Sequence, residues 1–247
     1  MDYTKLNTLT YIQLKDLANI MELPLKRSKN ELIKDIIPCF KIWEQYKHTK
    51  IDHWKYVKQL GEKGKEGTTY LVKTHKFPAG GEYYAMKTFN KKKSGSRLYI
   101  EASLQQKAAD AGVAPQVIDV DPISKHIVMQ CMEKHLWDML VKTKQLSINQ
   151  QRQIIGLYKK LDKIGIFHGD ANLMNYMYQG GKLYMIDFGM SKEINDSLIK
   201  KLNTSTPNIN IMTLGLILKL RNMNFNEESW VYLEKYLSME QKSQFNL

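Results

Sequence analysis

The chain has 247 residues, of which 43% are hydrophobic and 10% aromatic. This composition excludes global disorder and allows one large domain, or a modest domain with a small module. No apolar run reaches the roughly 18 residues that cross a bilayer, and the N-terminus lacks the basic and apolar regions of a signal peptide. The formal charge of +12 favours a polyanionic partner, such as a nucleic acid or a nucleotide, or serves solubility alone.

The two cysteines, Cys39 and Cys131, are far apart and show no metal-ligand spacing. Unpaired thiols are typical of a reducing compartment. We therefore expect an intracellular protein of the cytoplasm or nucleus.

Residues 4–38 have the pattern of two short helices. Their apolar residues recur in steps of three and four, and Pro24 interrupts the pattern. Ser28 and Glu31 have the spacing of a capping box at the start of the second helix. We expect Pro38 to end that helix, because proline lacks a backbone N–H group.

A basic block, Lys26-Arg27-Ser28-Lys29, stands at the start of the second helix. Basic side chains beside free backbone N–H groups suit phosphate oxygens. The segment resembles the SAP motif, a two-helix DNA-binding module, although Arg27 stands where that family usually has glycine. The resemblance implies that Lys26, Arg27 and Lys29 contact duplex DNA. The alternative is a helical hairpin that packs on the rest of the chain without touching DNA.

From Trp54 onward, short β-branched and aromatic runs alternate with turns, which predicts a strand-rich region. The expected elements are antiparallel strands at 54–60, 69–73 and 83–89, a helix at 96–111, and two strands within 115–132 joined at Asp121-Pro122. From Leu136 the helical period dominates, with turns around 165–175 and 180–192. The sequence therefore predicts an α+β fold of two lobes. We expect the charge run Lys91-Lys92-Lys93 to be a solvated loop.

Two signals fall in the strand-rich region. Gly61, Gly64 and Gly67 lie between two predicted strands, where glycines let backbone N–H groups approach phosphates; an ordinary hairpin turn is the alternative. Lys87 follows Tyr84-Ala85-Met86 in an apolar strand and needs an anion there. A nucleotide phosphate and Glu101, the only carboxylate of residues 96–108, are the candidates; the alternative is an edge-strand lysine that faces water.

Two further signals lie in the helical region. The loop His168-Gly169-Asp170 continues to Asn175, which places a proton acceptor and a neutral oxygen ligand five residues apart. Met185-Ile186-Asp187-Phe188-Gly189 ends a predicted strand in a second carboxylate. Phosphoryl transfer needs a carboxylate that orients the attacking hydroxyl and oxygen ligands for Mg²⁺.

These four signals, in this order, resemble the protein-kinase superfamily over roughly residues 54–220. The resemblance implies ATP and Mg²⁺ as cofactors. It makes Asp170 the catalytic base, pairs Lys87 with Glu101 on the α- and β-phosphates, and makes Asn175 and Asp187 the metal ligands. The remaining implied nucleotide-binding residues are Gly61, Gly64 and Gly67 over the phosphates and Ala85, Met129 and Cys131 near the adenine.

The chain also departs from the common kinase pattern. Gly169 replaces an arginine, Asn172 stands where a lysine usually touches the γ-phosphate, and Asn210 replaces an aspartate that braces the catalytic loop. No Ala-Pro-Glu sequence lies between Gly189 and Asn210. These departures resemble the KEOPS-complex kinases, the RIO kinases and reduced kinases of large DNA viruses. By analogy the SAP-like segment favours a viral kinase, for which a virion is a further location.

We therefore expect a SAP-like hairpin at 1–40, a linker at 41–53 and a kinase-like domain at 54–247, whose N-lobe ends near residue 132 and whose C-lobe covers 133–247. The expected function is ATP-dependent phosphoryl transfer to Ser or Thr of a protein, including a DNA-associated or viral target. The alternatives are a small-molecule phosphotransferase, a pseudokinase and a DNA-binding adaptor.

Overall fold

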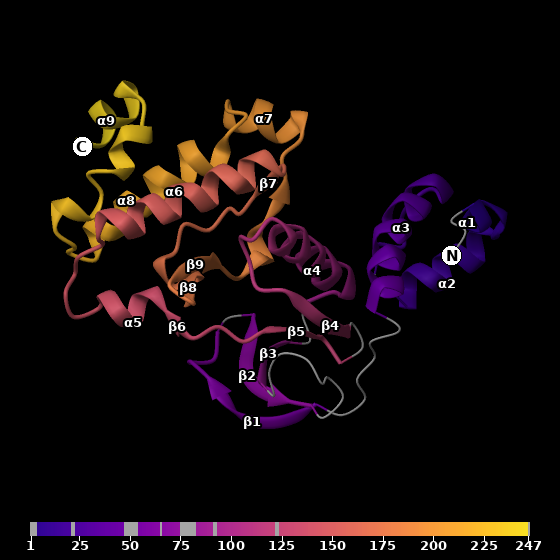
Figure 1. Ribbon diagram of the computed structural model, residues 1–247. Coiled ribbons are helices and arrows are strands. Elements are labelled where there is room, and N and C mark those ends of the chain that lie inside the picture. The colour runs from indigo at the N-terminus through magenta and orange to yellow at the C-terminus, as the bar shows by residue number, and fades with distance from the viewer. Residues whose placement is uncertain are drawn as a thin grey trace. The chain divides into compact units, whose positions relative to one another are not determined.

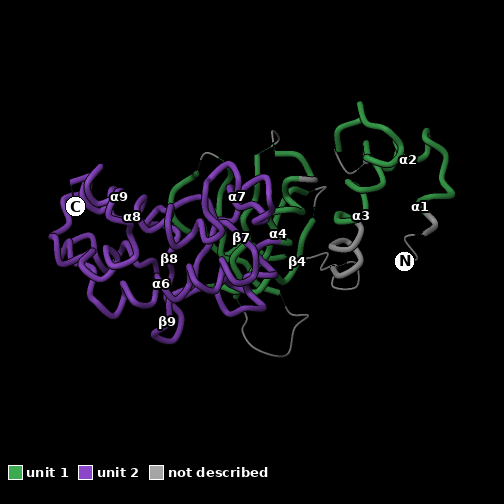
Figure 2. Tube along the Cα trace, turned by 90° about the horizontal axis from the view of Figure 1, so that it is seen from above, with its two compact units in different colours: residues 1–103, 116–131 green, residues 104–115, 132–247 purple. Residues whose placement is uncertain are grey.

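The computed structural model describes residues 4–20, 23–46, 54–64, 66–74, 83–90, 93–121 and 124–246. Of the predicted features, Lys91, Lys92, Pro122 and positions 47–53 of the linker lie outside the described residues. The chain divides into two compact units (Figure 2). Unit 1 comprises residues 1–103 and 116–131, and unit 2 comprises residues 104–115 and 132–247.

Unit 1 contains a five-stranded antiparallel sheet with the order β1-β2-β3-β5-β4 (Figure 1). Its strands are β1 (Lys55–Leu60), β2 (Gly67–Lys73), β3 (Tyr83–Phe89), β4 (Val117–Asp121) and β5 (His126–Gln130). Helix α4 covers Gly95–Asp110, and its residues up to Ser103 belong to unit 1. The predicted strands and the predicted helix of this region are thus confirmed.

Strand β3 carries two kinds of side chain because successive residues point to opposite faces of a sheet. Tyr84 and Met86 belong to one buried cluster, with Val72 and Val128. Phe89 belongs to a second cluster, which also holds residues of α4. Lys87 shares the face of Phe89, so the alternation of β3 turns this lysine toward α4.

The N-terminal helices are α1 (Thr4–Thr8), α2 (Tyr11–Ile20) and α3 (Lys29–Tyr46). The predicted capping box is present: the backbone N–H of Ser28 donates to Glu31 Oε2 at 2.8 Å, and the backbone N–H of Glu31 donates to Ser28 Oγ at 3.4 Å. The prediction that Pro38 ends this helix is wrong, because α3 continues to Tyr46, into the predicted linker. Proline costs the helix one hydrogen bond, and burial of Ile36 and Cys39 on either side of it offsets that cost.

Buried apolar residues of α2 and α3 lie in one cluster with residues from the first half of α4 and from one face of the sheet. The helices contribute, among others, Leu14, Ala18, Leu32 and Ile36, and the rest of unit 1 contributes Leu98, Tyr99, Val120 and Ile127. A hairpin of this size has little core of its own. This shared core is what the packing-hairpin alternative predicts.

We expect Leu32→Ala to lower the free energy of unfolding by about 3 kcal/mol, because a fully buried leucine leaves a cavity when truncated. Leu25→Ala is the matched control: Leu25 is 38% exposed, and its truncation should change stability by no more than about 0.5 kcal/mol. Urea unfolding measures both values. Since the core is shared, hydrogen exchange should also rise in β4 and β5 of the Leu32 variant. A rise confined to residues 1–46 would contradict the shared core.

Unit 2 is mostly helical. Its helices are α5 (Leu136–Leu140), α6 (Ile148–Lys163), α7 (Asp196–Leu202), α8 (Thr213–Asn222) and α9 (Met239–Phe245), and a π-helical turn, Asn208–Met212, leads into α8. Short 3-10 helices cover Leu173–Asn175, Phe188–Met190, Glu227–Ser229 and Leu233–Tyr236. The strands form two small antiparallel sheets: β6 (Lys134–His135), β8 (Tyr176–Gln179) and β9 (Lys182–Met185) in one, β7 (Ile166–Phe167) and β10 (Lys192–Glu193) in the other.

The expected α+β class is confirmed, with an antiparallel sheet in unit 1 and mainly helices in unit 2. The hairpin of β8 and β9 is the main element of unit 2 that the sequence pattern did not predict in full. Among the described residues, no helix has the length and apolar content needed to span a membrane.

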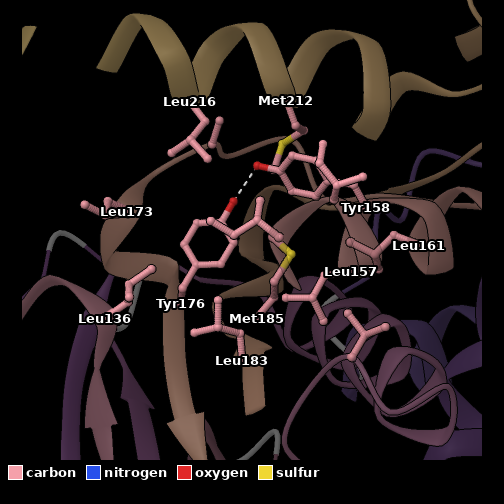
Figure 3. Close-up of a cluster of buried hydrophobic side chains, with 14 of the residues drawn as sticks. Leu136, Leu157, Tyr158, Leu161, Leu173, Tyr176, Leu183, Met185, Met212 and Leu216 are labelled. Atoms are coloured by element: carbon pink, nitrogen blue, oxygen red, sulfur yellow. Dashed lines mark hydrogen bonds between the residues drawn. The ribbon is translucent and has the colours of Figure 1, made fainter. Parts of the chain in front are cut away.

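The core of unit 2 supports the loop that follows β7. Tyr158 of α6 and Tyr176 of β8 are fully buried, and their hydroxyl groups point toward one another and share a hydrogen bond (Figure 3). Leu173 and Leu216 pack in the same cluster. Because Leu173 is fully buried, it anchors the segment 168–175 to this core.

Candidate active site

In unit 1, β3 and α4 bring Lys87 and Glu101 together. Lys87 Nζ lies 2.8 Å from Glu101 Oε1, and the side chains are 14% and 2% exposed. The expected contact is present, and this burial contradicts the alternative in which Lys87 faces water. A buried pair of opposite charges compensates its own desolvation only when both partners are in place.

Lys93 is a second cation on Glu101. Its ammonium donates to Glu101 Oε2 and lies 2.8 Å from Glu66 Oε2, and it sits 4.5 Å from the centroid of the Phe89 ring. The side chain is only 8% exposed. The prediction of a solvated loop is therefore wrong for Lys93, because two carboxylates and an aromatic face replace its water.

The three glycines lie where β1 turns into β2. Gly61 has a φ of +68°, and the N–H of Gly64 donates to the carbonyl of Gly67 at 2.9 Å. A Cβ on Gly67 would stand 1.8 Å from the carbonyl oxygen of Thr88, which is impossible without moving β2 away from β3. The close packing of β2 against β3 is therefore a sufficient reason for glycine at position 67. The binding of nucleotide phosphates by this turn stays a prediction.

The expected adenine contacts lie on adjoining strands. Ala85 of β3 is opposite Met129 of β5, and Cys131 directly follows β5. Neither Cys39 nor Cys131 forms a disulfide bond. Burial raises the pKa of the Cys131 thiol, while the charge of Lys58 acts in the opposite direction, so the thiol is protonated near neutral pH.

We expect Lys87→Met and Glu101→Gln each to lower the rate of phosphoryl transfer on the order of 10²-fold, because Glu101 positions the positive charge of Lys87 and the two side chains act as one unit. The fold-loss of transfer rate in the double variant should be much smaller than the product of the two single losses. Initial rates with ATP measure the three values, and thermal unfolding checks that each variant folds. Fully multiplicative losses would show that Glu101 is not the functional partner of Lys87.

In unit 2, Asp170 and Asn175 face one another across the loop that precedes β8. Asn175 Nδ2 donates to Asp170 Oδ2 at 2.9 Å, and Lys219 Nζ of α8 donates to Asp170 Oδ1 at 3.0 Å. Asn175 is buried. Because its amide nitrogen is committed to Asp170, its carbonyl oxygen Oδ1 is the atom suited to a cation.

Asp187 follows β9 in a left-handed conformation, with φ 65° and ψ 71°. Its Oδ1 accepts a hydrogen bond from the backbone N–H of Gly189 at 3.3 Å. The described residues contain no group of three or more His, Cys, Asp or Glu side chains that could hold a metal ion. Mg²⁺ commonly takes one or two protein oxygens together with substrate phosphates, so the oxygens of Asn175 and Asp187 are a chemically suitable donor set.

The buried side chain of His168 links the loop 168–175 to the segment around Asp187. It is fully buried, its ring packs edge-on against Phe188 at 4.9 Å, and Nε2 lies 3.1 Å from the carbonyl oxygen of Ile186. Burial lowers the pKa of His168. The imidazole is therefore neutral near pH 7, and the contact with Ile186 assigns its proton to Nε2.

Gly169, the substitution for the usual arginine, is explained by the backbone. Its φ is +80°, and a Cβ at this position would stand 2.9 Å from the carbonyl oxygen of Met190. A side chain would be strained both by its backbone conformation and by this approach. The loop geometry thus excludes the arginine of the common pattern.

Asn208, and not Asn210, braces the loop 168–175, so the prediction for Asn210 is wrong. Asn208 Oδ1 accepts from the backbone N–H of His168 at 3.0 Å, and its Nδ2 donates to Asp162 Oδ1 at 2.7 Å. Asn210 Nδ2 instead donates to Thr204 Oγ1. The π-helical turn that starts at Asn208 changes the register of the residues before α8. Burial raises the pKa of Asp162, and its hydrogen bonds to Asn208 oppose that shift.

The basic block of the N-terminal hairpin contacts the hairpin itself. Arg27 lies 3.7 Å from Glu31 and 3.8 Å from Asp35, and Lys29 Nζ donates to the backbone carbonyl of Asn7 at 3.1 Å. Exposed ion pairs of this kind contribute little to stability. These contacts engage Arg27 and Lys29, two of the three cations proposed for DNA, and are compatible with the packing hairpin.

The sequence pattern did not identify three residues of these sites: Lys93, Asn208 and Lys219. Lys219 carried a partial signal, because it is the one charged residue of positions 212–220, although its side chain is 44% exposed and burial does not require an anion there. Nothing in the sequence separated Lys93 from its solvated neighbours, or Asn208 from Asn210.

No family model matches the chain. It is similar to "KEOPS complex subunit Bud32" of Pyrococcus abyssi, with 35% identity over 105 residues, which cover 40% of this chain and 46% of the relative. It is also similar to "Probable serine/threonine-protein kinase BUD32 homolog" of Archaeoglobus fulgidus, with 30% identity over 109 residues, which cover 44% of this chain and 52% of the relative.

A third relative is the "Probable bifunctional tRNA threonylcarbamoyladenosine biosynthesis protein" of Methanobrevibacter smithii, with 31% identity over 111 residues, which cover 44% of this chain and 20% of the relative. The chain thus spans about half or less of the length of these curated relatives. The similarity supports the resemblance to KEOPS-type atypical kinases. None of the three names describes a SAP module, a DNA-binding protein or a virus.

Proposed function

We propose that this chain is an atypical, Bud32-like phosphotransferase that moves the γ-phosphoryl group of ATP to a Ser or Thr hydroxyl of a protein. The observation that carries the proposal is the arrangement around Asp170. One carboxylate oxygen is held by the amide of Asn175 and the other by the ammonium of Lys219, at 2.9 and 3.0 Å. This fixes the orientation of a proton acceptor beside an oxygen ligand, as phosphoryl transfer requires.

The chain's own residues take these roles in the proposal. Asp170 accepts the proton of the attacking hydroxyl, and Lys87, paired with Glu101, holds nucleotide phosphates. Asn175 and Asp187 would hold Mg²⁺, which when bound neutralises phosphate charge. Gly61, Gly64, Gly67, Ala85, Met129 and Cys131 would complete the nucleotide-binding residues.

We further propose that the chain works with protein partners. The Pyrococcus abyssi relative is named as a subunit of the KEOPS complex, and the Archaeoglobus fulgidus relative as a probable serine/threonine-protein kinase. The segment between Gly189 and Asn208 is shorter than the activation segment that regulates larger kinases. Control by a bound protein is therefore the regulation that suits this chain.

Purified full-length chain with γ-labelled ATP and Mg²⁺ tests the reaction class. Casein and histone serve as protein acceptors, a panel of small alcohols as low-molecular-weight acceptors, and released phosphate reports hydrolysis. We expect label on Ser or Thr of protein, including the chain itself. Label on the alcohols alone would identify a small-molecule phosphotransferase, and nucleotide binding without any transfer would identify a pseudokinase.

A further inference from the structure

We propose that Lys219 of α8 is the cation that meets the transferred phosphoryl group, in the role of the lysine that most protein kinases carry at the position of Asn172. The proposal rests on the proposed function and adds a residue to it. Asp170, Asn172 and Lys219 all belong to unit 2.

Asn172 cannot fill this role itself, because its side chain is used elsewhere. Its Oδ1 accepts a hydrogen bond from the backbone N–H of Met174 at 3.1 Å and caps the short helix Leu173–Asn175. An amide that caps a helix start holds the backbone of the loop. The catalytic loop therefore presents no cation two residues after Asp170.

Lys219 reaches the same carboxylate from a different element. Its Nζ lies 3.0 Å from Asp170 Oδ1, with side chains 44% and 27% exposed. The body of α8 is anchored on both sides of this lysine, since Leu216, Ile217 and Leu220 are fully buried. The ammonium is thus placed by a rigid helix at the edge of the catalytic loop, open enough to contact a substrate phosphate.

An ordinary exposed ion pair contributes little to stability. The partner of Lys219, however, is the proposed catalytic base, and Asn175 holds the base's other oxygen.

In the proposed step, the acceptor oxygen forms a bond to the γ-phosphorus while the bond from that phosphorus to the β,γ-bridging oxygen breaks, and ADP leaves. The acceptor's proton passes to a carboxylate oxygen of Asp170. Lys219 stays protonated throughout. It neutralises negative charge on the transferred group and keeps Asp170 oriented toward the hydroxyl.

The test compares steady-state kinetics of the full-length chain and its variants with ATP and a protein acceptor. We expect Lys219→Met to lower kcat about 10²-fold, with the KM for ATP changed by less than about threefold because ground-state binding is retained. Lys219→Arg, which keeps the charge, should retain at least about tenfold more activity than Lys219→Met. Lys201→Met, an exposed lysine of α7, is the matched control and should behave as wild type.

The decisive variant combines Lys219→Met with Asn172→Lys. It returns a cation to the usual position, so its kcat should exceed that of Lys219→Met. The single variant Asn172→Lys measures how much activity is lost when the side chain of residue 172 no longer caps the helix Leu173–Asn175. Wild-type turnover in Lys219→Met would overturn the inference. So would a loss that neither Lys219→Arg nor Asn172→Lys relieves, because this pattern identifies a structural role.

Failure of the underlying function has a different signature. A wild-type chain that binds ATP by calorimetry but transfers no phosphoryl group removes the reaction itself, and both proposals fall. A wild type that is active, with Asp170→Asn inactive and Lys219→Met fully active, overturns only the role of Lys219.

Discussion

Asp187→Asn is expected to lower phosphoryl transfer by at least about 10³-fold while leaving the fold intact. The change removes the negative charge that suits the side chain to a divalent cation. It keeps an oxygen that can accept the N–H of Gly189, the bond present at 3.3 Å. Asparagine also tolerates the left-handed backbone of this position, φ 65° and ψ 71°, which alanine does less well.

Initial rates over a range of Mg²⁺ concentrations measure the loss, and the midpoint of thermal unfolding checks the fold. Asp196→Asn is the matched control, because Asp196 is an exposed carboxylate in the first turn of α7. It should retain wild-type turnover. Activity of the Asp187→Asn variant above a tenth of wild type would show that Asp187 is not a metal ligand. A loss of activity in Asp187→Ala would then reflect only the loss of the turn that Asp187 stabilises.

Asp170→Asn is expected to lower transfer by on the order of 10²-fold or more while nucleotide binding survives. The amide cannot accept a proton from the attacking hydroxyl. It has one oxygen, so it can satisfy either the amide N–H of Asn175 or the ammonium of Lys219, and not both.

Calorimetry with a non-hydrolysable ATP analogue measures binding, and single-turnover kinetics measure the chemical step. Asn175→Ala is a useful comparison, because it should impair binding of the metal-bound nucleotide as well as turnover. Equal losses of binding and turnover in Asp170→Asn would instead indicate that Asp170 holds the loop together and does not act as the base.

Local sequence determined most elements of unit 1. Apolar alternation gave β3 two distinct faces, and the spacing of Ser28 and Glu31 specified the start of α3. These are short-range effects, since a strand's faces and a helix cap depend on residues within a few positions. The contact of Lys87 with Glu101 could be anticipated because Glu101 is the only carboxylate of residues 96–108 in the predicted helix.

Other features depended on residues far apart in the chain. The sequence predicted that Pro38 ends a helix, but burial of Ile36 and Cys39 in the core of unit 1 keeps α3 helical beyond it. Lys93 reads as a solvated charge until the fold sets Glu66 and Glu101 around it. Burial and pairing of this kind are tertiary effects that no local pattern encodes.

In the loop 168–175 and at Asp187, the sequence by itself specified the residue types, and the tertiary structure decided their partners. Asp170, Asn175 and Asp187 stand out in the sequence through the resemblance of their motifs to the protein-kinase superfamily. The π-helical turn decided that Asn208 braces the loop, and the packing of α8 decided that Lys219 reaches Asp170. A motif fixes which groups are available over a few residues, whereas the approach of two segments 49 residues apart is set by how their helices pack.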